Sequence, residues 1–300
     1  LLLRNSHLVT TYAPDGHRPQ RNPAPRPPAQ ADPTIPVRRT PDEGGHVPGR
    51  RRRALNRHPK HATQPPTINP RHAEQHGLRD ASRHHPNPGL LAPLQSILHH
   101  EGHRTFAADL TDQDGWQAED YANEVHRQFP ETHTPTIIAH SGAGLLAPAT
   151  AAKLNATHIV WIGALIPDLT GTMSMMEELA DHGDEIFPPE WFQWSGTELL
   201  TNQAVSAYFL FHDCDLEQLK FALTTLRLFQ PQGAFNQRHK HDDLPRSTVI
   251  VPTQDRVIRP NWMCRAAEAR LGTTAIEIDG DHCPHIPPAQ EIADIILRRA

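Results

Sequence analysis

Aromatic residues, cysteines and long apolar runs are all scarce in this 300-residue chain. Phe, Trp and Tyr make up 6% of the residues, and no apolar run reaches the length of about 18 residues that a membrane-spanning helix requires. The three cysteines, Cys214, Cys264 and Cys283, are odd in number and far apart, which excludes a complete disulfide framework. Free thiols are typical of a reducing compartment, so we expect a cytoplasmic protein with no membrane contact.

Residues 1–88 lack bulky apolar side chains. Their one aromatic residue is Tyr12, and they contain 16 of the 30 prolines and 15 basic against 6 acidic residues. So few apolar groups cannot offset an ordering cost of roughly 1–2 kcal/mol per residue. We therefore expect this segment to be largely disordered or atypical, with the first strands of any sheet missing. The rest of the chain has 14 basic and 28 acidic residues, so the net charge of −5 combines two oppositely charged parts.

Four consecutive arginines occupy positions 50–53. Such a cluster attracts nucleic acid or an anionic surface, and a solvated arm is the competing interpretation. The segment has no interleaved aromatic residues on which bases would stack. We therefore do not expect nucleic acid as a partner.

From residue 89 onward, short apolar runs alternate with segments of helical length, which is the pattern of an α/β protein. The runs predict strands at 105–108, 135–139, 158–162, 248–251 and 274–278, and helices at 90–100, 116–129, 142–154, 261–271 and 288–299. Pro148 predicts a kink in the third of these helices. At about 167–240 the alternation gives way to helical stretches, which we interpret as a lid insertion. The sequence thus predicts one domain at 89–300, with a mostly parallel central sheet, flanking helices and a helical lid.

Three side chains with the chemistry of a hydrolytic site each follow a predicted strand. Ser141, Asp255 and His282 occur in this order, in turns where a parallel sheet presents its functional groups. A serine hydroxyl needs a base to become a nucleophile, and the base needs a carboxylate to orient it. Ala139 and Ala143 flank Ser141 at two residues on either side, where a strained strand-to-helix turn admits only small side chains. The pattern predicts a catalytic triad.

Each of these residues also has a structural interpretation. Ser141 alone is a common turn residue, and Asp255 is suited to capping the helix that follows it. Residues 281–285 (DHCPH) offer metal ligands, but their adjacent placement fits a closed ligand set poorly, so we expect no metal. His140, next to Ser141, is expected to pack rather than to act as a second base. The common order and the strand-end positions favour the triad.

These motifs resemble the α/β-hydrolase superfamily, and within it the esterase branch that includes plant methylesterases and hydroxynitrile lyases. The resemblance covers about residues 90–300 and rests on 101–104 (EGHR) with 108–111 (ADLT), 139–144 (AHSGAG), 212–215 (HDCD), 251–260 (VPTQDRVIRP) and 279–285 (DGDHCPH). It implies that Ser141 attacks the carbonyl of a small-molecule ester, that His282 relays the proton and that Asp255 orients His282, without an organic cofactor. Hydroxynitrile lyases of this branch have a lysine where this chain has Cys283, so the resemblance implies esterase chemistry.

The resemblance also implies two backbone donors that stabilise an oxyanion. Gly142 is expected to supply one of them. The family takes the second from a loop that follows an apolar strand just before the first helix, and residues 71–88 contain no such strand. Asn87 or Gly89 is the candidate that remains. The alternative function is therefore a non-catalytic or impaired binding protein of the same fold, whose oxyanion hole is incomplete.

Overall fold

The centre of the protein is a mixed β-sheet with the strand order β2-β1-β3-β4-β5-β6. We describe it from a computed structural model, which covers residues 7–12, 89–194, 201–227, 229–287 and 289–299. The strands are β1 (His7–Tyr12), β2 (Arg104–Ala107), β3 (Thr136–His140), β4 (His158–Ile162), β5 (Arg246–Pro252) and β6 (Ile276–Ile278). Strands β3 to β6 are parallel neighbours, whereas β1 runs antiparallel to both β2 and β3. The predicted α/β fold with a largely parallel sheet is confirmed.

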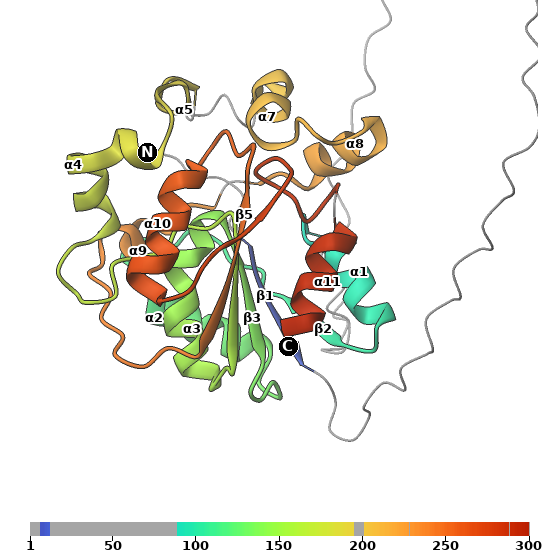
Figure 1. Cartoon of the computed structure of the whole chain (residues 1–300). Coiled ribbons are helices and arrows are strands. Elements are labelled where there is room, and N and C mark those ends of the chain that lie inside the picture. The colour runs from blue at the N-terminus through green and yellow to red at the C-terminus, as the bar shows by residue number, and fades with distance from the viewer. Residues whose placement is uncertain (1–6, 13–88, 195–200, 228, 288, 300) are drawn as a thin grey trace, which may run out of the picture. The chain divides into compact units, whose positions relative to one another are not determined.

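Helices cover both faces of this sheet (Figure 1). On one side lie α1 (Ala92–His100) and α11 (Ala289–Arg299), and on the other lie α2 (Ala118–Gln128), α3 (Ala147–Leu154) and α10 (Pro260–Leu271). Strands β3 and β4 are buried along their whole length, which is why they read as continuous apolar runs. Their side chains alternate between the two faces: Ile137 and Trp161 join one core cluster, and Ile138 joins the other.

Strand β1 is an unpredicted element within residues 1–88. It pairs with β2 and β3, and its first residue, His7, lies opposite His140 at the carboxyl end of β3. Its last residue, Tyr12, lies opposite Arg104, the first residue of β2. Strand β1 therefore ends at the amino ends of the parallel strands, on the opposite side from Ser141. The arginine cluster at 50–53 lies outside the described residues.

The predicted helix at 142–154 is divided in two. Residues Ser141–Leu146 form a 3₁₀ segment, η1, and α3 begins only at Ala147. Pro148 therefore lies in the first turn of α3, where its missing N–H has no intrahelical partner to lose. The predicted kink is replaced by this change of helix type. Two glycines in η1, Gly142 and Gly144, account for the change, because glycine is a poor former of regular α-helix.

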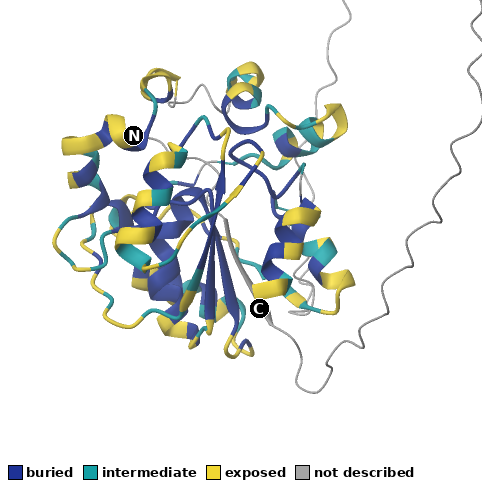
Figure 2. Ribbon diagram, in the orientation of Figure 1, coloured by how far each residue is buried: buried dark blue, intermediate teal, exposed yellow. Residues whose placement is uncertain are grey.

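A group of helices separates β4 from β5 in the sequence. They are α4 (Met175–Ile186), α5 (Pro189–Trp194), α7 (Gln203–Leu210), α8 (Leu216–Thr225) and α9 (Gln232–Asn236). In Figure 1, α5, α7 and α8 lie beyond the carboxyl ends of the parallel strands, and Figure 2 shows exposed residues on their outer surfaces. This is the position that a lid would take, and the boundary at 167–240 stays a prediction. Every helix in the described ranges is too short or too polar to span a bilayer.

His158, the first residue of β4, makes folding sensitive to pH. Its imidazole is buried and its Nε2 lies 2.9 Å from the Thr248 hydroxyl on the neighbouring strand β5. Burial, with smaller contributions from the charges of Arg246 and Arg299, lowers the pKa of His158 from 6.5 to about 4. The unfolded chain therefore binds a proton at a higher pH than the folded chain does.

We predict that the protein loses stability through His158 as the pH falls from about 6.5 towards 4. The loss is about 2 kcal/mol between pH 6.5 and 5, since each pH unit in this window is worth about 1.4 kcal/mol. Urea unfolding of the wild type and of His158→Gln across this range measures it, and the variant should show a smaller fall. His133→Gln, at an exposed position before β3, is the control. Equal pH dependence in the wild type and His158→Gln would contradict the prediction.

Candidate active site

The chain makes a sharp turn at Ser141, directly after β3. His140 is still extended, with φ −116° and ψ 138°, whereas Ser141 has φ 57°, in the left-handed region. An L-residue pays roughly 1–2 kcal/mol for that conformation, so surrounding contacts must hold it. Ala139 and Ala143, on either side of the turn, are both fully buried. The small side chains expected at these two positions are thus packed where larger ones would not fit.

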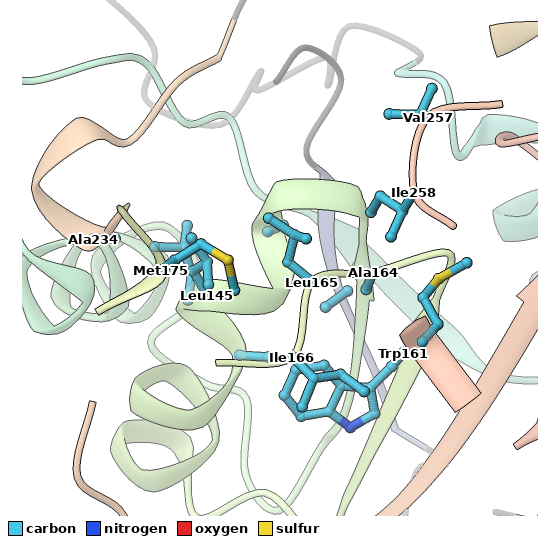
Figure 3. Close-up of a cluster of buried hydrophobic side chains, with 14 of the residues drawn as sticks. Leu145, Trp161, Ala164, Leu165, Ile166, Met175, Ala234, Val257 and Ile258 are labelled. Carbon is cyan, nitrogen blue, oxygen red and sulfur yellow. The ribbon is translucent and has the colours of Figure 1, made fainter. Parts of the chain in front are cut away.

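The segment after β4 supplies the contacts that hold this turn. The Leu165 N–H donates a hydrogen bond of 3.0 Å to the Ser141 carbonyl. A Cβ added at Gly144 would lie 1.9 Å from the Leu165 carbonyl oxygen, so only glycine permits this approach. Figure 3 shows Leu165 beside the helical turn, within a cluster of buried apolar side chains. Leu165 therefore fixes the turn through its own backbone on both sides.

The three predicted site residues come together at the carboxyl ends of the strands. The Ser141 Oγ lies 3.0 Å from the Nε2 of His282, and the Nδ1 of His282 lies 2.8 Å from the Oδ2 of Asp255. Ser141 is fully buried, His282 is 1% exposed and Asp255 is 8% exposed. Because the Asp255 carboxylate accepts a hydrogen bond from the Nδ1–H of His282, the neutral imidazole keeps its lone pair at Nε2, facing the serine hydroxyl.

The Asp255 carboxylate is also fixed by the backbone. Its Oδ1 accepts hydrogen bonds from the amides of Val257, at 2.7 Å, and Ile258, at 2.9 Å. The turn role considered for Asp255 and the orienting role are therefore compatible, because each uses a different oxygen. Two amide donors leave the second oxygen directed at His282.

The loops that carry Asp255 and His282 are both bound to the segment of α7 and the turn that follows it. Arg256 donates from Nη1 to the Tyr208 carbonyl at 3.0 Å and lies over the Tyr208 ring. Asp281 accepts from the backbone amides of Asp213, at 3.0 Å, and Cys283, at 2.9 Å. Burial raises the pKa of Asp281 to about 6, although the hydrogen bonds from these two amides lower it. The helices between β4 and β5 thus contact both loops of the site.

His140 packs behind His282, as predicted. Its Nε2 lies 2.9 Å from the main-chain oxygen of His282, and its ring contacts the rings of His282 and His285. The Ser141 hydroxyl is paired with His282 rather than with His140. His140 therefore supports the loop of the base from beneath.

The oxyanion donors are placed only in part. Gly142 is buried directly after Ser141 in η1. Gly89 lies in the turn before α1, where its carbonyl accepts a hydrogen bond of 2.8 Å from the Ala92 amide. Asn87 lies outside the described residues. On one side of β3 lies β1, which runs antiparallel to it and ends beside the amino end of β3. The carboxyl end of β1 therefore lies at the opposite ends of the strands from Ser141, whereas the second donor must face Ser141.

A cavity of about 440 Å³ lies beside this site. It reaches Asp255, together with Tyr208, Phe209, Arg256 and Arg259, but Ser141 does not line it. Because the serine hydroxyl is enclosed, this cavity is not the space in which a substrate carbonyl would meet it.

Two residues of the site were not singled out from the sequence. Leu165 and Gly163 follow β4, and Gly163 has φ 48°, with Asp255 and His282 atoms 3.4 Å from where its Cβ would be. A glycine directly after a buried strand is a recognisable signal of close backbone approach. The Leu165 contact has no such signal, because it is made by backbone atoms alone.

Comparison with known proteins identifies the family of this chain. Residues 76–295 match the alpha/beta hydrolase family, and the chain therefore belongs to that family. No curated protein matches the chain.

Solved structures with the same fold include several esterases. A variant of polyneuridine aldehyde esterase aligns with a TM-score of 0.57 at 16% identity, covering 70% of this chain and 93% of that one. An Arabidopsis methylesterase aligns with a TM-score of 0.50 at 15% identity, covering 70% of this chain and 92% of that one. A pyrethroid hydrolase from Sphingobium faniae aligns with a TM-score of 0.53 at 13% identity, covering 70% of this chain and 90% of that one. The similarity to the methylesterase branch is confirmed, and at these identities it establishes the fold.

We predict that Gly144→Ala destabilises the protein by about 3 kcal/mol, because its methyl group would force the Leu165 carbonyl away. Gly272→Ala is the matched control, since its Cβ meets no atom within 4 Å and it pays only for a φ of 60°. We expect about 1 kcal/mol for that change. Urea unfolding of both variants measures the difference. Equal losses would show that Leu165 does not restrict the turn.

Proposed function

We propose that this protein is a serine hydrolase that cleaves carboxylic esters of small molecules. The observation that carries the proposal is the continuous line of hydrogen-bonded atoms from Asp255 through His282 to Ser141. A buried line of this kind activates a hydroxyl that is otherwise a weak nucleophile.

The reaction follows from the positions of the protons. Nε2 of His282 takes the Ser141 proton as Oγ attacks the ester carbonyl, and then gives that proton to the departing alcohol. The acyl group stays on Oγ until a water molecule, deprotonated by the same nitrogen, releases it as the acid. Asp255 stabilises the imidazolium that forms in both steps. These steps use only protein side chains and water.

The negative charge on the attacked carbonyl oxygen needs donors that face it. The amide of Gly142 supplies one, because it is the first amide after the nucleophile in a turn that exposes its N–H groups. The second comes from the segment before α1, where Gly89 is the described candidate. Removal of one such donor typically costs about 10²–10³ in kcat, so this segment sets much of the rate.

Two further observations support ester hydrolysis. The residue after His282 is Cys283, where the related hydroxynitrile lyases have a lysine. Several structures with the same fold are named as esterases or as a pyrethroid hydrolase, although they are only 13–17% identical to this chain. Since Ser141 is enclosed, we propose that the helices between β4 and β5 act as a lid that opens for the substrate.

A second candidate is a non-catalytic binding protein on the same fold. Two observations favour it: Ser141 is 0% exposed, and β1, a strand next to β3, ends beside the amino end of β3 rather than beside Ser141. The same site would then hold a small molecule without turning it over.

We propose that the protein works in a reducing compartment, namely the cytoplasm. All three cysteines are free thiols. Because Cys283 is buried and Cys214 and Cys264 are half-buried, none is positioned as an exposed reactive group.

We predict that the purified full chain hydrolyses short p-nitrophenyl esters and that Ser141→Ala lowers kcat roughly 10⁴-fold or more. Asp255→Asn should lose about as much, because the imidazole then adopts the wrong tautomer. Release of p-nitrophenol measures both. Ser247→Ala, which changes a serine bonded to Trp161 at the start of β5, is the control and should retain activity.

Labelling with a fluorophosphonate probe separates the two candidates, since only an activated serine reacts. Labelling of the wild type and Ser247→Ala, but not of Ser141→Ala, supports the hydrolase. A folded wild-type protein that neither labels nor hydrolyses any of the esters would favour the binding protein.

A further inference from the structure

A second group of reactive side chains lies behind the candidate active site. It consists of His140, at the end of β3, together with Cys283 and His285 from the loop after β6. All three residues are buried. None of them takes part in the proposed hydrolysis, so their combination calls for an account of its own.

The three side chains are arranged as metal ligands are. One nitrogen from each imidazole and the Cys283 Sγ all lie within 4.8 Å of one another. The distance from the Cys283 Sγ to the His140 Nε2 is 4.0 Å. Around a tetrahedral Zn²⁺, with Zn–S and Zn–N bonds of about 2.3 and 2.0 Å, these two atoms would be about 3.5 Å apart. A closure of about 0.5 Å would bring this pair into place, and the most distant ligand atoms, within 4.8 Å of one another, would have to close by up to about 1.5 Å.

We propose that His140, Cys283 and His285 bind a single Zn²⁺ ion, or another borderline or soft divalent metal, directly behind His282. The set of one thiolate and two imidazoles is one that such metals prefer. Metal binding would replace the hydrogen bond of 2.9 Å between the His140 Nε2 and the main-chain oxygen of His282, and a water molecule would complete the four ligands. Since His140 is remote in sequence, the three side chains do not depend on consecutive residues to close the set.

Binding exchanges a proton for the metal. The neutral Cys283 thiol gives up its proton, the sulfur forms a bond to the ion, and the proton passes to solvent, with no change of oxidation state. The buried Asp281 carboxylate, which accepts a hydrogen bond from the Cys283 amide, would offset part of the ion's remaining positive charge.

The site also bears on hydrolysis, and this part of the inference depends on the proposed function. The rings of His140 and His282 are 4.8 Å apart. His282 must become positively charged during the reaction, and a cation bound to His140 opposes that charge. Metal binding is therefore expected to inhibit the esterase reversibly.

The decisive test is a titration of the metal-free full chain with Co²⁺, a spectroscopic substitute for Zn²⁺. The chain has 22 histidines, so binding alone would not identify the site, whereas a thiolate-to-Co²⁺ charge-transfer band requires a cysteine ligand. We expect one equivalent of Co²⁺ to produce this band and Zn²⁺ to abolish it by displacement. Cys283→Ser should lose the band, and Cys264→Ser, on α10, should keep it.

A second variant guards against a folding defect in Cys283→Ser. His285→Gln keeps the thiol and should weaken Co²⁺ binding at least about tenfold, since one of the protein ligands is lost. Circular dichroism shows whether each variant is folded. No band in the wild type, a band that survives in folded Cys283→Ser, or unchanged affinity in folded His285→Gln would each overturn the site.

The inhibitory part has a separate readout. Zn²⁺ should lower ester hydrolysis by the wild type at least about tenfold and a chelator should restore it, while Cys264→Ser should respond as the wild type does. Unchanged hydrolysis in Zn²⁺-loaded wild type would overturn inhibition and leave the site established by its absorption band. If the protein hydrolyses no ester, the proposed function fails, and the Co²⁺ titration still decides the site.

Discussion

The left-handed turn at Ser141 is the constraint on which the rest of the site depends. It places the hydroxyl at the end of β3 and directs the following backbone into η1, at a conformational cost that must be offset elsewhere. The offset comes from Leu165, whose N–H binds the Ser141 carbonyl and whose own carbonyl rests on Gly144. Because Leu165 follows β4, the neighbour of β3 in the sheet, the register of these two strands sets the position of the serine.

The side chains of the site are held in place by a line of hydrogen bonds that begins at backbone amides and ends at this turn. The amides of Val257 and Ile258 hold Asp255, Asp255 holds His282, and His282 faces Ser141. A flexible carboxylate would lose orientation each time the imidazole gained or lost a proton. Two hydrogen bonds from backbone amides to its other oxygen prevent this. The site is therefore preorganised on the side that must stabilise charge.

The sequence predicted the parts of this structure that depend on local pattern. The buried strands β3, β4 and β5 are runs rich in branched apolar residues, and the three site residues follow strands, so strand-end logic located them. Strand β1 was missed because HLVTTY is short, mixed in polarity and next to a proline-rich stretch. It is held by backbone pairing with β2 and β3, about 100 residues or more away, and no local pattern records such pairing.

The contacts that refine the site were beyond prediction for a similar reason. Leu165 acts on Ser141 and Gly144 through its main chain, so its side-chain type carries no information about the contact. Asp281 was visible as a neighbour of His282, but its bond to the Asp213 amide joins segments 68 residues apart. A pattern identifies which groups can react, whereas the fold decides which backbone atoms hold them.

Cys283 shows how far that distinction extends. A fully buried thiol has no access to a substrate, so its role is either to fill space or to coordinate. Space alone would be filled as well by an aliphatic side chain of similar volume, without the cost of bringing imidazoles and a thiol into the same interior. Coordination uses what distinguishes these three side chains from aliphatic ones, and it does so within the loop that positions His282. A metal bound at Cys283 would therefore act on the residue directly before it, the proposed base His282.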